Sequence, residues 1–160
     1  MRTIIDLRND DELGENDGGV EKIQIPLDGL DEDPEFWADW MNGPQFGTPL
    51  YYGPFVERFP DRIEAVLHAI ENAPAGGVLF HCVGGRDRTG LVAIAALTVA
   101  GVSPELIADD YVLGAQRAHT HDAMLEEFLA ERGTSAHELV MELAAGLRYD
   151  RPALRARLVV

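Results

Sequence analysis

The sequence predicts an α/β fold with a small, mainly parallel sheet flanked by helices. Three short runs rich in Ile, Val and Leu, at residues 3–8, 20–27 and 77–80, have the length and composition of strands. Helical patterns of apolar residues separate the second run from the third and continue after it. A strand followed by a buried helix is half of a βαβ unit, in which strands run parallel. We expect one domain over residues 1–160, because this length suits a single hydrophobic core.

The first third of the chain combines two predicted strands with acidic loops. The runs "TIIDLR" at 3–8 and "VEKIQIPL" at 20–27 are separated by a stretch of Asn, Asp, Glu and Gly residues that favours turns. Acidic and irregular sequence begins at Asp28, and proline and glycine recur up to residue 49. We therefore expect residues 28–49 to be mostly loop, with one short helix.

A helix of three or four turns and a short apolar strand follow. Pro60 precedes the helical pattern, Pro74 and two glycines follow it, and apolar residues recur between them at Ile63, Val66, Leu67 and Ile70. The run "GVLF" at 77–80 is too short and too apolar for a half-exposed strand. A strand covered on both faces reads as continuous apolar sequence, so 77–80 is predicted to be a buried central strand of the parallel sheet.

The second half of the chain is predicted to be helical. Residues 88–101 are apolar on nearly all sides, which indicates a helix buried along the sheet. Three further helices are indicated: one starting at Ser103 and Pro104, one over 120–132, and one over 136–146 that the Ser135 and Glu138 capping box begins.

Four arginines are concentrated near the C-terminus, in "LRYDRPALRARL" at 147–158. A segment of this charge is able to dock on an acidic partner or on the protein's own acidic loop. A solvated terminal helix is the simpler interpretation, and it is the one we adopt.

Composition limits the classes of partner. The chain has 13 basic and 28 acidic residues and a net charge of −15, which argues against a nucleic acid or an anionic membrane as the main partner. The longest apolar stretch, at 90–102, is shorter than the roughly 20 residues that span a bilayer, so we expect no stable membrane insertion. No secretory leader pattern follows Met1, and we expect a cytoplasmic protein.

The cysteine count restricts the chemistry further. One cysteine cannot form an internal disulfide, and the Cys and His residues lack zinc-ligand spacing. We expect neither a metal nor another cofactor. A reducing compartment, which the cytoplasm provides, would keep a lone catalytic thiol reduced.

That single cysteine lies in "LFHCVGGRDRTG", residues 79–90. A strand that leads through this loop into a helix brings the backbone N–H groups of 83–88 together at the positive end of the helix dipole, which makes an anion site. Gly84 and Gly85 allow the close approach and unusual backbone angles that such a loop requires. The pattern predicts a phosphate-binding loop around Cys82.

The same loop favours nucleophilic chemistry. A thiol at a helix N-terminus and beside a guanidinium ionises more readily than a free one, so Cys82 is predicted to be a nucleophile at neutral pH. Arg88 follows after five residues, and its planar fork is suited to pair with two oxygens of a phosphoryl group. Preorganised N–H and guanidinium donors of this kind stabilise the charge that spreads over those oxygens during phosphoryl transfer.

These residues carry a family resemblance. "HCVGGRDRTG" is similar to the signature of the protein-tyrosine-phosphatase superfamily, which reads His-Cys, five residues, then Arg-Ser/Thr-Gly. The "RDR" at 86–88 resembles the Lys-Asp-Arg variant of the bacterial atypical tyrosine phosphatases that also act on phosphoinositides, with Arg86 in place of Lys. "IIDLRNDDE" and "GVSPELIADDY" are similar to flanking segments of that branch, and the resemblance covers roughly residues 3–118.

The resemblance implies a cysteine-dependent phosphatase fold and a role for each loop residue. Cys82 would form a thiophosphate intermediate, Arg88 would clamp it, Thr89 would assist release by hydrogen-bonding the sulfur, and His81 would orient the loop. The remaining predicted residues bind phosphate (Val83, Gly84, Gly85, Arg86 and Asp87) or support the site (Gly90 and Arg8). Tyr51, Tyr52 and Tyr111 are expected to pack rather than to bind substrate.

The general acid that protonates the leaving group is expected on a separate loop. Asp28 follows the second strand where the resembling branch carries its acid, and it is our first choice. Asp39, in "WAD", superficially resembles the Trp-Pro-Asp loop of larger tyrosine phosphatases but lacks the proline. Asp31, Asp33 and Asp87 remain as further candidates.

The function that we expect is hydrolysis of a phosphorylated protein or a small phosphate ester, with phosphotyrosine first and dual-specificity or phosphoinositide activity as variants. A noncatalytic module that binds a phosphorylated ligand is one alternative. A cysteine-based sulfurtransferase or arsenate reductase is another. The intact Cys82, Arg88 and Thr89 disfavour the first, and the "RTG" sequence and the absence of a resolving cysteine disfavour the second.

Overall fold

The computed structural model describes residues 2–13, 21–30, 32–117 and 123–159, so part of the predicted turn run and the first residues of the predicted 120–132 helix lie outside the described residues. It is an α/β fold, as predicted. The described part contains a three-stranded parallel sheet of β1 (Thr3–Asp6), β2 (Glu21–Gln24) and β3 (Val78–His81) in the order β2-β1-β3.

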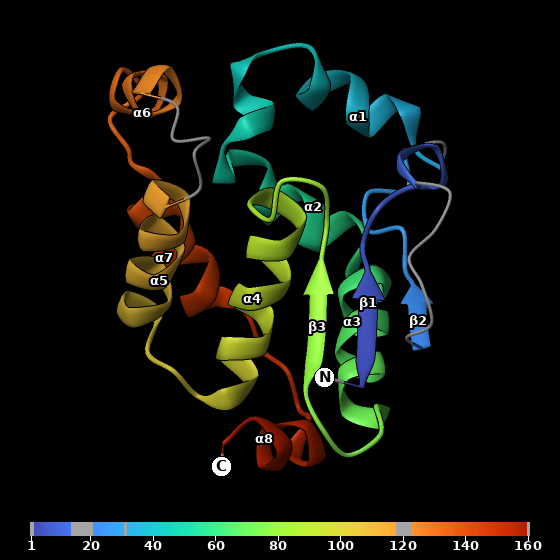
Figure 1. Ribbon diagram of the computed structural model, residues 1–160. Coiled ribbons are helices and arrows are strands. Elements are labelled where there is room, and N and C mark those ends of the chain that lie inside the picture. Colours follow the sequence, from blue (N-terminus) through green and yellow to red (C-terminus); the bar gives the residue numbers. More distant parts are fainter. Residues whose placement is uncertain (1, 14–20, 31, 118–122, 160) are drawn as a thin grey trace.

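The described residues also form eight α-helices, which lie behind this sheet and to one side of it (Figure 1). Three 3-10 helices lie in the first third of the chain: η1 (Asp10–Glu12), η2 (Pro44–Gly47) and η3 (Pro49–Tyr51). The α-helices are α1 (Pro34–Met41), α2 (Tyr52–Arg58), α3 (Pro60–Asn72), α4 (Asp87–Ala100), α5 (Pro104–Arg117), α6 (Ala123–Ala130), α7 (Ala136–Gly146) and α8 (Pro152–Leu158). None of the helices in the described ranges is long and apolar enough to cross a membrane.

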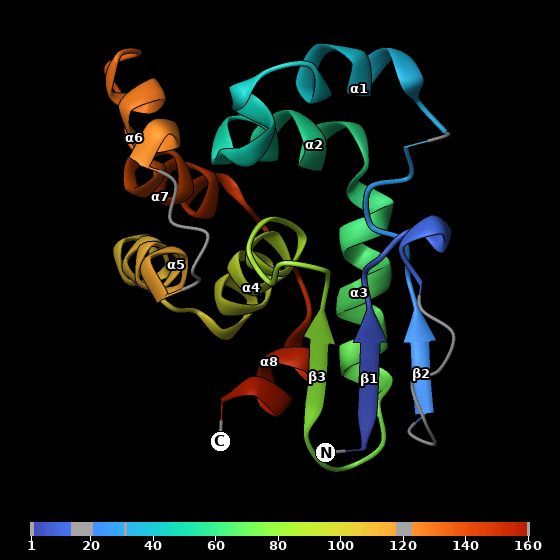
Figure 2. The same cartoon turned by 45° about the horizontal axis from the view of Figure 1, so that its top comes forward.

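The prediction that the third strand is central is wrong. Among the described strands β1 is in the middle, and β3 is at the edge. Ile5, its register partner Phe80 and α3 lie on one side of the sheet, where Ile5 is completely buried. Figures 1 and 2 show α3 behind the strands and no helix of the described residues in front of them. Leu79 points to that front face and is 42% exposed, so an apolar residue on the open face made the run look buried on both sides.

The elements that hold the site follow sequence signals closely. Pro60 begins α3, and Ile63, Val66 and Leu67 are buried on one side of it. Six residues of α4 are buried, and this helix ends at Gly101, whose φ of 83° lies in the left-handed region that glycine adopts at helix ends.

The prediction that residues 28–49 are mostly loop is wrong, because α1 and η2 together cover 12 of these 22 residues. The side chain of Asp33 caps α1, and a proline begins each of the two helices. The short helix expected in this segment is present as α1.

The C-terminal segment is not a solvated helix, so that interpretation is wrong. Leu154 of α8 is completely buried. Arg151 forms ion pairs with Glu64 and Glu71 of α3. Arg157 donates hydrogen bonds to the carbonyl groups just beyond the end of α3. Arg151 and Arg157 therefore dock on α3 and the residues just after it, rather than on the acidic segment after β2.

Candidate active site

The sheet places the cysteine loop at the carboxyl end of β3, directly before α4 (Figure 1). Gly85 has a φ of 70°, which requires a residue without a side chain, whereas Gly84 is not among the glycines with positive φ. Arg86 is the N-cap residue of α4, and no side chain caps this end of the helix. The free N–H groups of the first turn are thus available to an anion, as expected from the sequence.

The sulfur of Cys82 is held by two donors from its own loop. The Gly85 backbone N–H donates to it over 3.3 Å, and the Thr89 hydroxyl over 3.2 Å. The Thr89 oxygen in turn accepts a hydrogen bond of 3.0 Å from the Cys82 backbone N–H. Both donors point at the sulfur, and Cys82 is only 7% exposed.

Arg88 is held by a carboxylate that the sequence analysis did not assign. Its Nη1 and Nη2 atoms donate to the two carboxylate oxygens of Glu12, over 2.5 and 2.7 Å. This end-on pairing uses one edge of the guanidinium. The other edge carries the Nε–H and a second N–H of Nη2, and it is the edge that can take two oxygens of a phosphoryl group.

Glu12 is itself fixed in the 3-10 helix η1. Its carboxylate accepts a hydrogen bond of 2.8 Å from the Asn9 backbone N–H. The hydrogen bond from Arg88 lowers the pKa of Glu12, so this carboxylate stays ionised. A signal for the residue was present, because Glu12 is the last residue of the segment "IIDLRNDDE", which resembles a flanking segment of the bacterial branch. Nothing in the sequence, however, pairs Glu12 with Arg88.

Asp28 lies beside Arg88, at the end of the segment that follows β2. One of its carboxylate oxygens is 3.2 Å from Arg88 Nη1 and 3.4 Å from the amide of Asn9. The Trp37 indole N–H donates to its backbone carbonyl over 3.2 Å. Burial is the largest influence on this carboxyl group and raises its pKa to about 6, although Arg88 acts in the opposite direction.

The other candidate acids have different surroundings. Asp39 is exposed on α1, and its backbone carbonyl accepts a hydrogen bond from the Gln45 side-chain amide. Asp33 caps the start of α1 and pairs with Arg58. Asp87 pairs with Arg86 at the start of α4. Asp31 lies outside the described residues. Of these carboxylates, Asp28 is the one recorded in contact with Arg88.

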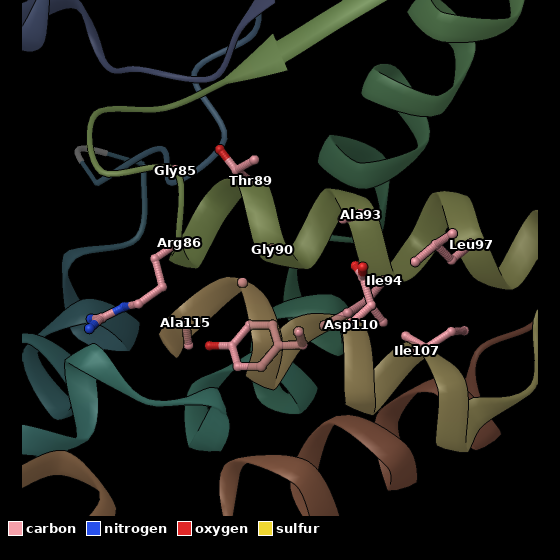
Figure 3. A pocket seen from close by; sticks show the side chains of 12 residues that line it. Gly85, Arg86, Thr89, Gly90, Ala93, Ile94, Leu97, Ile107, Asp110 and Ala115 are labelled. Atoms are coloured by element: carbon pink, nitrogen blue, oxygen red, sulfur yellow. The ribbon is translucent and has the colours of Figure 1, made fainter. Parts of the chain in front are cut away.

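The Arg86 side chain points away from the side of the loop on which Thr89 lies (Figure 3). Figure 3 shows Thr89 and Arg86 on different sides of the first turn of α4. The Arg86 guanidinium pairs with Asp87, and it lies close enough to Gly47 of η2 that a Cβ there would be 3.0 Å from Nη2. It borders a cavity of about 120 Å³ between α4 and α5. Cys82, Arg88 and Asp28 do not line this cavity.

The supporting residues lie around the loop. His81 Nδ1 is 3.0 Å from the Cys82 carbonyl oxygen. Arg8 forms an ion pair of 2.6 Å with Asp6, and its Nη1 donates to the backbone carbonyl of Glu12 over 3.4 Å. Val83 is 66% exposed at the tip of the loop. Gly90 allows α5 to approach, because a Cβ at this position would be 2.8 Å from the Tyr111 ring.

The tyrosines pack, as expected, and two of them support the loop. The Tyr52 and Tyr111 hydroxyl groups are 3.0 Å apart, and Tyr52 donates a hydrogen bond of 3.2 Å to the Asp87 carbonyl. This pair ties α2 and α5 to the first residue of α4. The described residues contain no group of three or more His, Cys, Asp or Glu side chains that could hold a metal ion.

Comparisons with known proteins agree with this geometry. A family model described as "Tyrosine phosphatase family" matches residues 1–158. A "Tyrosine-protein phosphatase" of Nostoc commune is 39% identical over 54 residues, which are 34% of this chain and 18% of that protein. The chain therefore matches less than a fifth of the length of this relative. Because the family model extends over nearly the whole sequence, the chain belongs to the tyrosine phosphatase family.

Proposed function

We propose that the protein hydrolyses phosphate monoesters, phosphotyrosine in particular, through a cysteinyl-phosphate intermediate. The observation that carries this proposal is the arrangement around Arg88, which lies on the same loop as a hydrogen-bonded Cys82 sulfur and contacts the buried carboxyl group of Asp28. Family membership and the similarity to a protein named as a tyrosine-protein phosphatase support it.

In the first step the Cys82 sulfur attacks phosphorus, and the bond from phosphorus to the leaving oxygen breaks. Asp28 transfers its proton to that oxygen, which its raised pKa of about 6 allows near neutral pH. The free edge of Arg88 and the N–H groups at the start of α4 bind the phosphoryl oxygens, where negative charge is spread in the transition state.

In the second step a water molecule attacks phosphorus, and the bond from sulfur to phosphorus breaks. Asp28, now a carboxylate, takes the proton of this water and is restored as an acid. The departing thiolate is stabilised by the Thr89 hydroxyl and the Gly85 N–H, which contact the sulfur in the structure. Thr89 would therefore assist the release of phosphate from Cys82.

Phosphotyrosine is preferred to inositol lipids because of Arg86. A substrate with a second phosphate needs another cation close to the loop, and Arg86 is the nearest candidate. Its guanidinium is paired with Asp87 and packs toward Gly47. A second phosphate would have to displace this carboxylate, so we place phosphoinositide activity below phosphotyrosine activity.

Turnover by purified protein tests the proposal. We expect hydrolysis of 4-nitrophenyl phosphate and of a phosphotyrosyl peptide, slower hydrolysis of phosphoseryl peptides and phosphoinositides, and no activity above a few per cent in Cys82→Ser. Cys82→Ser should still bind inorganic phosphate, because the backbone donors and Arg88 remain. Phosphate binding without turnover by the wild type would favour a noncatalytic module, and an active Cys82→Ser variant would remove Cys82 as the nucleophile.

A further inference from the structure

Asp6 has no role in the proposed reaction steps, but contacts connect its carboxylate both to the Cys82 loop and to Arg88. Asp6 is the last residue of β1, the middle strand, and its side chain is completely buried. The register places it opposite Gln24 of β2 and His81 of β3. It therefore lies at the carboxyl end of the sheet, where the cysteine loop begins.

Asp6 is surrounded by basic side chains from all three strands or their ends. Lys22 Nζ and Arg8 Nη2 each lie 2.6 Å from the same carboxylate oxygen, and Arg8 Nε donates to the other over 2.9 Å. His81 Nε2 lies 3.8 Å away. Burial alone would raise the pKa of Asp6, but the hydrogen bonds from Arg8 and Lys22 outweigh it, so the pKa lies well below its ordinary value.

One connection from Asp6 leads to the nucleophile. His81 is adjacent to Asp6 through Nε2, and its other ring nitrogen, Nδ1, is 3.0 Å from the carbonyl oxygen of Cys82. A carbonyl oxygen can only accept a hydrogen bond, so Nδ1 is the ring nitrogen that donates to Cys82. The Asp6 carboxylate is too far from Nε2 for a hydrogen bond, and it faces the opposite edge of the ring as a nearby charge that favours this orientation. The ring in turn holds the first peptide unit of the cysteine loop.

The second connection leads to the clamp. The Arg8 guanidinium, fixed on Asp6, also donates from Nη1 to the backbone carbonyl of Glu12 over 3.4 Å. Glu12 holds Arg88 through both oxygens of its carboxylate. Movement of Arg8 would therefore move the η1 turn and, with it, the guanidinium that would bind phosphate.

We propose that Asp6 is a positioning residue, which sets the Cys82 loop through His81 and the Arg88 guanidinium through Arg8. The expected loss of turnover rests on the function proposed above. The effect of Asp6 on the positions of the Cys82 thiol and the Arg88 guanidinium does not depend on that function. If Asp6 served only to hold the strands together, loss of its other cation partner, Lys22, would have the same effect as loss of Asp6.

The test compares Asp6→Asn with Lys22→Met as the matched control. Because Cys82 is the only cysteine, its alkylation by iodoacetamide reports on the thiol without any need for turnover. The pH at which alkylation reaches half its maximal rate measures how well the loop stabilises the thiolate. Protection by inorganic phosphate in the same assay gives the phosphate dissociation constant, which depends on Arg88.

For Asp6→Asn we expect the alkylation midpoint to rise by about one pH unit and phosphate to bind about tenfold more weakly. The His81 ring loses the charge that faces Nε2, and Arg8 loses its charge-assisted hydrogen bonds. The value of kcat for 4-nitrophenyl phosphate should fall by more than tenfold. Lys22→Met should stay within about twofold of the wild type in all three measurements, because Asp6 keeps its contacts with Arg8 and His81 when Lys22 is replaced. Equal changes in the two variants, or none in Asp6→Asn, would overturn the proposal.

Two further variants separate the connections and serve if Asp6→Asn fails to fold. His81→Asn should raise the alkylation midpoint and leave phosphate protection near the wild-type value. Arg8→Met should weaken phosphate protection and leave the midpoint unchanged. If both variants behave like Lys22→Met, Asp6 does not act through these residues. An inactive wild type with these same shifts would reject the proposed hydrolysis and retain the positioning role.

Discussion

Two carboxylates share one guanidinium in the site, and their surroundings drive their pKa values apart. Glu12 pairs end-on with Arg88, and this hydrogen bond lowers its pKa. Asp28 touches the same Arg88, but burial and the nearby Glu12 charge raise its pKa to about 6. Such a separation suits the two groups to different roles in the proposed reaction. Glu12 would be the permanently charged support, and Asp28 would be the group that exchanges a proton.

The role of Asp28 predicts a leaving-group effect. Asp28→Asn cannot donate a proton, so kcat for poor leaving groups such as alkyl phosphates should fall by about 10²–10⁴-fold, and that for activated aryl phosphates much less. The alkaline limb of the kcat profile, which the wild type should show near pH 6 from its raised pKa, should flatten.

Asp39→Asn is the matched control for this prediction, because Asp39 is exposed on α1 and was the rival candidate. Its leaving-group dependence and pH profile should equal those of the wild type. The assignment of Asp28 fails if Asp28→Asn slows good and poor leaving groups alike.

Replacing Glu12 should shift the alkaline limb of the same kcat profile. The negative charge of Glu12 disfavours ionisation of Asp28 and contributes to its raised pKa. In Glu12→Gln that contribution is lost, so Asp28 should ionise at lower pH and the alkaline limb of kcat should move to more acidic values. The Michaelis constant should also rise, because the amide holds Arg88 less firmly.

Asp11→Asn provides the comparison, since Asp11 is an exposed neighbour in η1. It should shift neither the limb nor the Michaelis constant. A limb that moves to higher pH in Glu12→Gln would contradict the coupling between the two carboxylates.

At the scale of elements, the helices that a local signal marks were predictable, and those fixed by tertiary contacts were not. Pro60 and the Ser135 cap begin α3 and α7 as expected, because the signal acts within one turn. The edge position of β3 was missed because Leu79 is apolar on an open face. The docking of α8 was missed because Arg151 reaches glutamates that lie 80 or more residues away.

The docking of α8 predicts an asymmetric effect of two leucines. Leu154 is completely buried, so Leu154→Ala should lower the free energy of unfolding by about 2–5 kcal/mol. Leu158, on the same helix, is 37% exposed, and Leu158→Ala should cost no more than about 1 kcal/mol. Urea unfolding measures both, and equal small losses would mean that α8 does not pack on the core.

At the scale of the whole molecule, the signature made the nucleophile loop predictable, and long-range pairing made the rest of the site unpredictable. The contacts of Cys82 lie within seven residues of it. Glu12 is 76 residues from its partner Arg88, and Asp6 meets His81 only because β1 and β3 are paired in register. Sequence spacing carries no information on such contacts, whereas the parallel sheet brings the strand ends together.

The net charge of −15 produces a long-range electrostatic repulsion of anionic substrates that no single residue accounts for. A dianionic substrate must approach a strongly negative molecule before it reaches the local donors of the cysteine loop. Salt screens this long-range repulsion, with a Debye length of about 10 Å at 0.1 M, but it screens the short contacts to Arg88 much less. Raising the ionic strength from 0.01 to 0.15 M with sodium chloride should therefore increase kcat/KM for 4-nitrophenyl phosphate by about two- to fivefold and leave kcat unchanged. A decrease in kcat/KM over this range would contradict this expectation. It would mean that Arg86 and Arg88 attract the substrate more strongly during its approach than the net negative charge of the protein repels it.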